Sequence, residues 1–387
     1  MAEPHVVINP RGADRLSAGH LWVYRSDIRG AEAAPGDIVR VTDERGRFLG
    51  KAFYSDRSQI SLRFLTREDI ALDRAFFAER IRAAAEFRKR VVENSEVCRL
   101  VYGEADLLPS LVVDRYADYL VIQTLSQGAD RRRDEIVDIL RELFAPRGIV
   151  ERNDPKVRLL EGLDQKVSLL AGDVPPEVIA TENGIRFHFD LFKGQKTGGF
   201  LDQRENRAAA AAYAHGEVLD CFTYNGGFAL TMASRCSHVE AIDLSPAAVA
   251  TARRNQELNN LTNVSFREGN AFDLLKEYDE AGKRFDLIVL DPPAFAKNRA
   301  SVPAARRGYK EINLRSLKLL RPYGFLVTCS CSHHIPEHLF LEIVAEAAND
   351  ARRHVRVVDR RTQSRDHPIL LTVPETHYIK CLCLQVL

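Results

Sequence analysis

The second half of the chain alternates short apolar runs with segments of helical length. Beyond about residue 195, five runs have the length and composition of strands, at 216–222, 238–244, 263–270, 285–293 and 323–332. Helical segments lie between them, for example 245–260 and 306–320. This alternation predicts an α/β fold with a doubly wound, mostly parallel sheet. Two further runs, 354–363 and 377–387, bring the expected sheet to seven strands.

The first 70 residues have a pattern of short strands and turns. The apolar residues of 38–41 and the alternating segment 58–65 predict strands, and Glu44-Arg45-Gly46 predicts a hairpin turn. We therefore expect a small β-rich module over residues 1–70. The basic and aromatic side chains that could contact RNA in this module are Arg11, Arg15, Trp22 and Arg25, and a core position is the alternative for Trp22.

The middle of the chain combines a helix with a second small β-rich unit. Apolar residues at helical spacing predict a linking helix over 73–92, whose basic face either is solvated or contacts RNA. A hairpin is expected over 110–125, a helix over 131–144, and strands near 148–154 and 166–170. The predicted pattern is β-β-α-β-β, and the expected domains are 1–70, 71–180 and 181–387.

Composition limits the classes of protein that remain. The chain has 387 residues, 45% hydrophobic and 28% charged, which excludes a wholly disordered protein. Lys and Arg number 55 against 54 Asp and Glu, so a nucleic acid would have to bind through a local patch. No apolar run of about 18 residues predicts a membrane-spanning helix. The first residues lack the pattern of a secretory signal, so we expect a cytoplasmic protein.

The cysteines are odd in number and form no CxxC pair, so neither a disulfide framework nor a zinc ribbon is expected. We predict no metal site, and we expect most of the thiols to be small buried side chains. The seven positions are Cys98, Cys221, Cys236, Cys329, Cys331, Cys381 and Cys383.

A glycine pair follows the first strand of the α/β part. Asn225-Gly226-Gly227 allows the backbone to pass close to a ligand, although the spacing is not GxGxxG and a plain turn is an alternative. Asp243 ends the next strand, where a carboxylate can accept hydrogen bonds from ribose hydroxyls. It could instead cap the following helix, but Ser245 suits that position and would leave Asp243 freer.

The third strand ends at Asn270, whose amide oxygen can reach an adenine edge. Together these features resemble the class I S-adenosylmethionine-dependent methyltransferases over about residues 195–387, although that class more often has Asp at this last position. The resemblance implies a Rossmann-like fold with S-adenosyl-L-methionine as cofactor. It implies a cofactor site formed by Asp220, Phe222, Tyr224, Asn225, Gly226, Asp243, Leu244, Asn270, Ala271 and Asp291.

Asp291 is followed by two prolines, which end the fourth strand and hold the loop of this carboxylate stiff. The sequence resembles the fourth methyltransferase motif. In enzymes of that kind that methylate exocyclic amines, an aromatic residue directly follows the prolines. Here Ala294 precedes Phe295, which argues against an amine target.

Carbon 5 of a pyrimidine becomes nucleophilic once a thiolate adds to carbon 6. The segment GFLVTCSCSHH places Cys329 and Cys331 at the end of the next strand, on one face if the strand persists. RNA pyrimidine-5-methyltransferases commonly carry Thr-Cys-Ser there, and counting from Gly324 matches their cysteine with Cys331. We predict Cys331 as nucleophile, Asp291 as the group that holds the ring, and Cys329 as core. Two structural cysteines are the alternative.

The segment FKGQKTGGFLDQRENR, residues 192–207, is consistent with a solvated basic loop. It also matches a segment typical of the large-subunit ribosomal RNA cytosine-5 methyltransferases, the RlmI-like group, in which it runs next to the cofactor. This resemblance adds Lys196, Thr197 and Gln203 to the expected cofactor site. The module at 1–70 resembles a PUA domain, a small RNA-binding β-barrel. The middle unit resembles the β-β-α-β-β insertion of the same family.

The family resemblance implies RNA as partner, 23S ribosomal RNA as substrate and 5-methylcytosine as product. It implies no membrane partner, and a homodimer stays open. Two other functions also stay open. One is a methyltransferase for a base amine or a small molecule, with Cys331 structural. The other is an RNA-binding protein whose methyltransferase fold has lost activity, against which Asp243, Asp291 and Cys331 argue.

Overall fold

The computed structural model describes residues 3–387, which form two compact units. Among the described residues, the first unit comprises residues 3–180, Phe189–Leu201 and Arg365–Thr376, and the second comprises Thr181–His188, Asp202–Ser364 and His377–Leu387. Residues 3–70 and 71–180 thus belong to one compact unit, and the predicted domain boundaries stay a prediction. No helix within residues 3–387 is long and apolar enough to cross a membrane.

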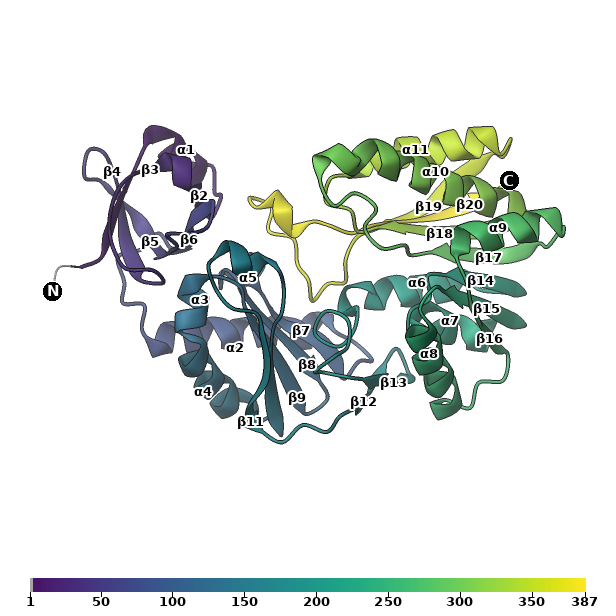
Figure 1. Cartoon of the computed structure of the whole chain (residues 1–387), viewed down its shortest axis with the longest axis horizontal. Coiled ribbons are helices and arrows are strands. Elements are labelled where there is room, and N and C mark those ends of the chain that lie inside the picture. Colours follow the sequence, from purple (N-terminus) through teal and green to yellow (C-terminus); the bar gives the residue numbers. More distant parts are fainter. Residues whose placement is uncertain (1–2) are drawn as a thin grey trace. The chain divides into compact units, whose positions relative to one another are not determined.

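The amino-terminal sheet has six strands in the order β2-β6-β5-β4-β1-β3 (Figure 1). Only β1 and β4 are parallel; the other neighbours are antiparallel. The predicted β-rich module is therefore confirmed, together with its hairpin between β4 and β5. The strands are β1 His5–Ile8, β2 Trp22–Tyr24, β3 Ile28–Glu32, β4 Ile38–Asp43, β5 Phe48–Tyr54 and β6 Ile60–Thr66.

The sequence pattern missed one helix in this module, α1 Pro10–Ser17. Asn9 caps it, because its side-chain oxygen accepts a hydrogen bond from the amide of Gly12 at 2.8 Å. Pro10 occupies the first helical turn, where a missing amide hydrogen costs nothing. Asn-Pro before a short amphipathic segment was the local signal for this helix.

The second sheet of the first unit has five strands in the order β11-β10-β9-β8-β7. The predicted hairpin and linking helix are confirmed, and the first strand, β7, was missed. Apolar side chains of the first module, including Phe53, join the core of this sheet, where Phe53 stacks on Phe77 with ring centroids 6.3 Å apart. The elements are α2 Arg74–Val91, β7 Val97–Tyr102, β8 Leu111–Tyr116, β9 Tyr119–Thr124, α3 Gln127–Arg131, α4 Arg133–Phe144, β10 Gly148–Asn153, α5 Val157–Leu160 and β11 Lys166–Gly172.

The second unit contains the predicted seven-stranded sheet, in the order β16-β15-β14-β17-β18-β20-β19. The first five of these strands run parallel to their neighbours, and β20 runs antiparallel to β18 and β19. The strands are β14 Glu217–Cys221, β15 His238–Asp243, β16 Val264–Glu268, β17 Phe285–Leu290, β18 Leu320–Ser330, β19 Val355–Arg361 and β20 Lys380–Val386. A separate pair, β12 Val178–Glu182 and β13 Ile185–Phe189, precedes them in the chain.

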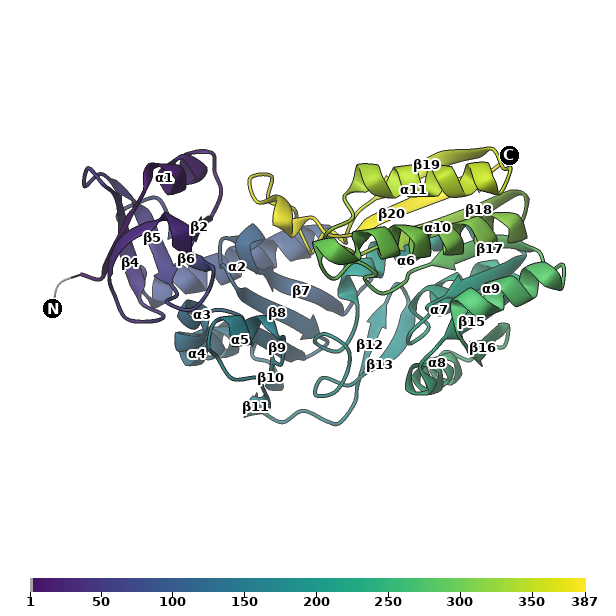
Figure 2. The same ribbon diagram turned by 45° about the horizontal axis from the view of Figure 1, so that its top comes forward.

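Helices cover both faces of this sheet, as the two ribbon views show (Figures 1 and 2). One face carries α9, α10 and α11, and the other carries α6, α7 and α8. Because β14, β15, β16, β17 and β18 are parallel, their carboxyl ends meet at one edge of the sheet, where ligands of such folds bind. The helices are α6 Arg204–Tyr213, α7 Gly227–Met232, α8 Pro246–Leu258, α9 Ala271–Glu280, α10 Val302–Leu319 and α11 Glu337–Asp350.

Candidate active site

The loop between β14 and α7 has an unusual backbone. Phe222 and Tyr224 have φ values of 66° and 52°, and Gly226 has a φ of 87°. Left-handed conformations are costly for non-glycine residues and cluster at ligand sites, where the surroundings hold them in place. A Cβ at Gly226 would lie 3.0 Å from a methyl carbon of Leu230, so a larger residue would be both strained and crowded.

Asp220 lies at the base of this loop and is fully buried. One carboxylate oxygen, Oδ2, accepts hydrogen bonds from the Thr223 hydroxyl at 2.6 Å and from the amide of Ala229 at 3.0 Å. The other oxygen, Oδ1, is buried and has no partner among the described residues. Burial, with a contribution from the Asp291 carboxylate, raises the pKa of Asp220 to about 7.

An unpartnered buried carboxylate oxygen fits a cationic ligand group. S-adenosylmethionine carries an ammonium group on its amino-acid part, and a hydrogen bond to that group would satisfy Oδ1 of Asp220. This acceptor therefore suits the ammonium group of the predicted cofactor. No cluster of three or more His, Cys, Asp or Glu side chains within residues 3–387 could hold a metal ion.

Asp243 lies at the end of β15, the strand next to β14. Ser245 caps α8, as predicted, because its hydroxyl accepts a hydrogen bond from the amide of Ala248. We expected this cap to leave Asp243 available to a ligand, but Asp243 also accepts hydrogen bonds within the protein. Its two oxygens accept the amides of Tyr224 at 2.8 Å and Ser245 at 2.9 Å. Each oxygen keeps a second lone pair, so a ribose hydroxyl remains an acceptable donor.

Three other residues of the predicted cofactor site lie at the ends of β15 and β16. Leu244 is 69% exposed, and its side chain offers an apolar surface to a ligand. Asn270 caps α9, since its oxygen accepts the amide of Phe272 at 3.0 Å, and Ala271 behind it is buried. The oxygen that we expected to contact adenine thus has a structural partner already. The part that Asn270 plays toward the cofactor stays a prediction.

Asp291 lies directly after β17, on the far side of β14 from Asp243. Its backbone amide donates to the carbonyl of Cys221 at 3.4 Å, which ties the ends of the two strands together. The Gln203 side chain donates to Oδ1 of Asp291 at 2.8 Å. Asn206, which the sequence analysis did not single out, donates in turn to the oxygen of Gln203 at 2.6 Å. Gln203 therefore contacts Asp291, whatever else it binds.

The other two cofactor residues predicted from the segment 192–207, Lys196 and Thr197, belong to the first unit. Thr197 is buried, and its hydroxyl donates to Asp114 at 2.6 Å and lies 3.0 Å from the Tyr116 hydroxyl. Lys196 is exposed, and its ammonium lies 4.7 Å from the centre of the Phe200 ring. Their predicted contact with the cofactor stays a prediction.

The two cysteines of the CSCS segment have different environments. Cys329 is fully buried within β18, opposite Cys381 of β20, which confirms its expected place in the core. A hydrogen bond with Cys381 lowers the pKa of Cys329, but burial and the Asp291 carboxylate outweigh it and raise that pKa overall. Cys331 lies beyond the end of β18, is half-buried, and has its Sγ 3.9 Å from the carbonyl oxygen of Pro292.

A hydroxyl network that the sequence did not reveal holds the Cys331 loop. The Tyr309 hydroxyl lies 3.0 Å from Oγ of Ser330 and 2.9 Å from Oγ of Ser332. Oγ of Ser332 also accepts the amide of Ala296 at 3.1 Å. The residues on either side of Cys331 are thus fixed to the loop that follows Asp291.

Phe295, the aromatic residue of this second loop, packs into the core. Its ring centroid lies 4.7 Å from that of Tyr309 and 6.0 Å from that of Phe272. The ring is therefore committed to packing, and it lies one residue beyond the position at which amine methyltransferases carry the aromatic residue that stacks a base.

The basic residues predicted to dock RNA have partners within their own module. Arg11 and Arg15 both form ion pairs with the buried Asp27, at 2.5 and 3.2 Å. Trp22 is half-buried, and its indole nitrogen donates to Glu104 at 2.9 Å. The side chain of Arg11 is nevertheless 63% exposed, so it could reach a phosphate without leaving Asp27.

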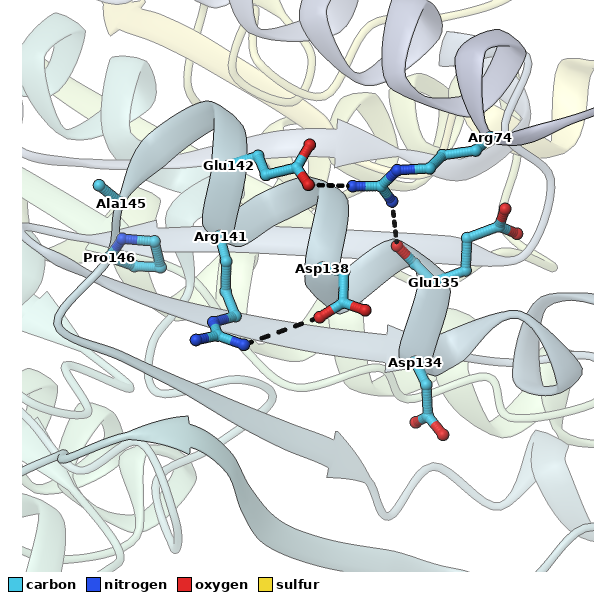
Figure 3. A pocket seen from close by; sticks show the side chains of 8 residues that line it. All are labelled: Arg74, Asp134, Glu135, Asp138, Arg141, Glu142, Ala145 and Pro146. Atoms are coloured by element: carbon cyan, nitrogen blue, oxygen red, sulfur yellow. Dashed lines mark hydrogen bonds and ion pairs between the residues drawn. The ribbon is translucent and has the colours of Figure 1, made fainter.

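A surface hollow of about 970 Å³ lies over α2 and α4 in the first unit (Figure 3). Ion pairs join Arg74 to Glu142 at 2.6 Å and Arg141 to Asp138 at 3.7 Å. Its four acidic side chains outnumber its two arginines, which disfavours a phosphate ligand, and it contains no predicted site residue. Its lining is Arg74, Asp134, Glu135, Asp138, Arg141, Glu142, Ala145 and Pro146.

Comparisons with known proteins agree with this architecture. Residues 6–67 match the PUA-like domain family, and residues 163–372 match the S-adenosylmethionine-dependent methyltransferase family. The chain is 41% identical over 379 residues to ribosomal RNA large subunit methyltransferase I of Tolumonas auensis, covering 95% of this chain and 96% of that protein. It is 42% identical over 391 residues to the protein of the same name from Shewanella amazonensis, covering 98% and 99%.

Solved structures share the fold across the whole chain. A methyltransferase from Streptococcus mutans, described as dependent on S-adenosylmethionine, has a TM-score of 0.84 at 20% identity, covering 99% of this chain and 100% of that one. A methyltransferase structure with bound S-adenosylhomocysteine gives the same values. These matches confirm the Rossmann-like fold, the PUA-like domain and the cofactor class. The chain belongs to the ribosomal RNA large subunit methyltransferase I family of S-adenosylmethionine-dependent methyltransferases.

Proposed function

We propose that this protein methylates carbon 5 of a cytosine in 23S ribosomal RNA, through a covalent adduct between Cys331 and carbon 6 of the base. The observation that carries the proposal is the position of the Cys331 thiol. It is half-buried, lies beyond the end of β18 and is 3.9 Å from the carbonyl of Pro292, next to Asp291. The names of the relatives support an RNA of the large ribosomal subunit as substrate.

The chemistry follows from what these side chains offer. The thiolate of Cys331 adds to carbon 6, which places the electron pair of the 5,6 double bond on carbon 5. When bound, S-adenosylmethionine would supply the electrophilic methyl group to carbon 5 and would leave as S-adenosylhomocysteine. Loss of the carbon-5 proton to a base then expels the sulfur of Cys331 and restores the double bond. In this mechanism Asp291, which accepts a hydrogen bond from Gln203, holds the N3 and amino edge of the ring while the adduct exists.

Asp220 and Asp243 have the complementary task of holding the cofactor. The unpartnered oxygen of Asp220 suits the ammonium group, and the remaining lone pairs of Asp243 suit the ribose. Both lie at the carboxyl edge of adjacent parallel strands, with Asp291 at the end of the strand on the other side of β14. This order supports an arrangement in which the cofactor and the base meet above β14.

An amine target is the competing proposal, and two observations weigh against it. Ala294 separates the prolines from Phe295, and the Phe295 ring is packed against Tyr309 and Phe272. A base amine would also leave Cys331 without a chemical task at a site where a partly exposed thiol is at risk of oxidation.

Trapping with a fluorinated base tests the mechanism directly. RNA that carries 5-fluorocytosine at the target should form a stable covalent complex with the wild type, because fluorine cannot leave as a proton does. The complex should persist in Cys329→Ala and be absent in Cys331→Ala, while both variants keep cofactor binding. If Cys331→Ala still methylates ordinary RNA, the cysteine mechanism is wrong and an amine target replaces it.

A further inference from the structure

A buried lysine lies beside the Cys331 loop. Lys380 begins β20, opposite Ser330 in the pairing with β18, and is only 4% exposed. Its ammonium donates to the carbonyl of Ser332 at 2.7 Å and to that of Tyr378 at 3.0 Å. Lys380 thus lies opposite the residue before Cys331, and its side chain contacts the residue after Cys331.

Lys380 has no carboxylate within ion-pair distance among the described residues, although burying a charge is costly unless it is paired. The groups whose negative charge favours its ammonium form are Cys331 and Glu337. Glu337, at the start of α11, is already paired with Arg360 of β19 at 2.7 Å. Burial lowers the pKa of Lys380 to about 8 in spite of both groups.

Several other titratable groups lie around Cys331. Tyr309 of α10 is buried and, for that reason first, has a raised pKa, so it faces the thiol as a neutral hydroxyl. Asp291, after β17, brings negative charge, which opposes a thiolate. His333 and His334 follow Cys331 in the same loop, and the ring of His333 lies against that of His334.

We propose that Lys380 is a positioning residue whose ammonium group stabilises the thiolate of Cys331 and whose hydrogen bond to Ser332 holds that sulfur at the end of β18. The proposed pair consists of the Cys331 thiolate and the Lys380 ammonium, which requires that the first proton lost by the two groups leaves from sulfur. The proposal rests on the proposed function, in which this thiolate is the nucleophile.

The test measures the thiol itself rather than methylation. Holding the full-length protein at a series of pH values, we would alkylate it with iodoacetamide and follow the Cys331 peptide by mass spectrometry. An ordinary cysteine thiol titrates near pH 8.5, so the wild-type midpoint should lie below that value by about one pH unit or more. Lys380→Met should raise the midpoint by about one to three pH units, and Lys380→Arg should restore most of the difference.

A matched control removes a different lysine charge from the same unit. Lys310 of α10 is paired with Asp350 at 2.8 Å, and Lys310→Met should leave the Cys331 midpoint unchanged. A Lys380→Met midpoint equal to that of the wild type overturns the proposal. If that variant does not fold, the wild type decides alone, because a midpoint at or above about pH 8.5 contradicts a stabilised thiolate.

The two proposals fail separately. A shifted midpoint combined with full methylation by Cys331→Ala would keep the Lys380 proposal for the thiol and reject the cytosine mechanism. A fluorocytosine adduct on Cys331 with no change in the Lys380→Met midpoint would do the reverse.

Discussion

Replacing Asp220 by asparagine should stabilise the protein without cofactor and weaken cofactor binding. Both hydrogen bonds that Asp220 accepts, from Thr223 and Ala229, end on the single oxygen Oδ2. An asparagine can keep both bonds with its carbonyl oxygen and place its amide nitrogen where the unpartnered Oδ1 lies. The substitution therefore removes the buried charge while it retains the local geometry.

The magnitude follows from the pKa of Asp220, which burial raises from 3.8 to about 7. A difference of about three pKa units corresponds to about 4 kcal/mol of unfolding free energy. Because the folded state holds a proton that the unfolded state releases above pH 4, stability falls as the pH rises from about 4 to 7. The loss of stability caused by ionised Asp220 is absent near pH 4 and reaches its full value above pH 7. Asp220→Asn should therefore gain up to about 4 kcal/mol over the wild type at pH 8 and almost nothing at pH 4.

Urea unfolding of the cofactor-free protein at the two pH values measures this difference, and calorimetry measures the affinity for S-adenosylmethionine. Loss of a hydrogen bond between charged groups should weaken binding by about 10- to 150-fold. Thr223→Val is a control that should change the stability in the opposite direction, because it removes a hydrogen-bond donor to the Asp220 carboxylate. This variant should be destabilised more at pH 8 than at pH 4. Equal stability of Asp220→Asn and wild type at pH 8 would refute the account of the buried charge.

Three further outcomes are expected. Asp243→Ala should weaken S-adenosylmethionine binding by about 1 to 3 kcal/mol in calorimetry, and unchanged affinity would remove Asp243 from the site. Gln203→Leu removes the donor to Asp291, so kcat should fall about tenfold or more with the cofactor Kd unchanged; a raised Kd would instead favour direct contact with the cofactor. Deleting residues 1–70 should weaken binding to ribosomal RNA fragments in a filter assay and leave cofactor affinity intact. It should also lower the unfolding midpoint, because apolar side chains of this module complete the core of the second sheet.

Local patterns predicted the elements of the second unit well. Each of the seven strands overlaps an apolar run that was recognised in the sequence, and β14 to β18 are joined by helices that make parallel pairing the expected outcome. The helix α2 has a clear start, since Asp73 accepts the amide of Phe76. These signals lie within a few residues of the feature that they predict, so one sequence is enough to recognise them.

Contacts between distant parts of the chain account for the side-chain contacts of the site that the sequence did not predict. Asp291 and Gln203 are separated by 88 residues, and no periodicity connects them. Thr197 belongs to a motif expected at the cofactor, yet its hydroxyl is bonded to Asp114, 83 residues earlier. Lys380 lies beside Cys331 only because β20 enters the sheet between β18 and β19, against the order of the chain. Pairing of this kind depends on the whole fold.

The choice between Cys329 and Cys331 shows how the end of a strand decides reactivity. Alternation alone puts both sulfurs on one face, and then nothing separates them. The structure ends β18 at Ser330, so Cys331 leaves the sheet while Cys329 stays opposite Cys381. A thiol that is buried within the sheet has no water to stabilise its anion, and a nucleotide base cannot reach it. A nucleophile on this strand therefore has to lie past the last paired residue, and Cys331 is the cysteine of CSCS that meets this requirement.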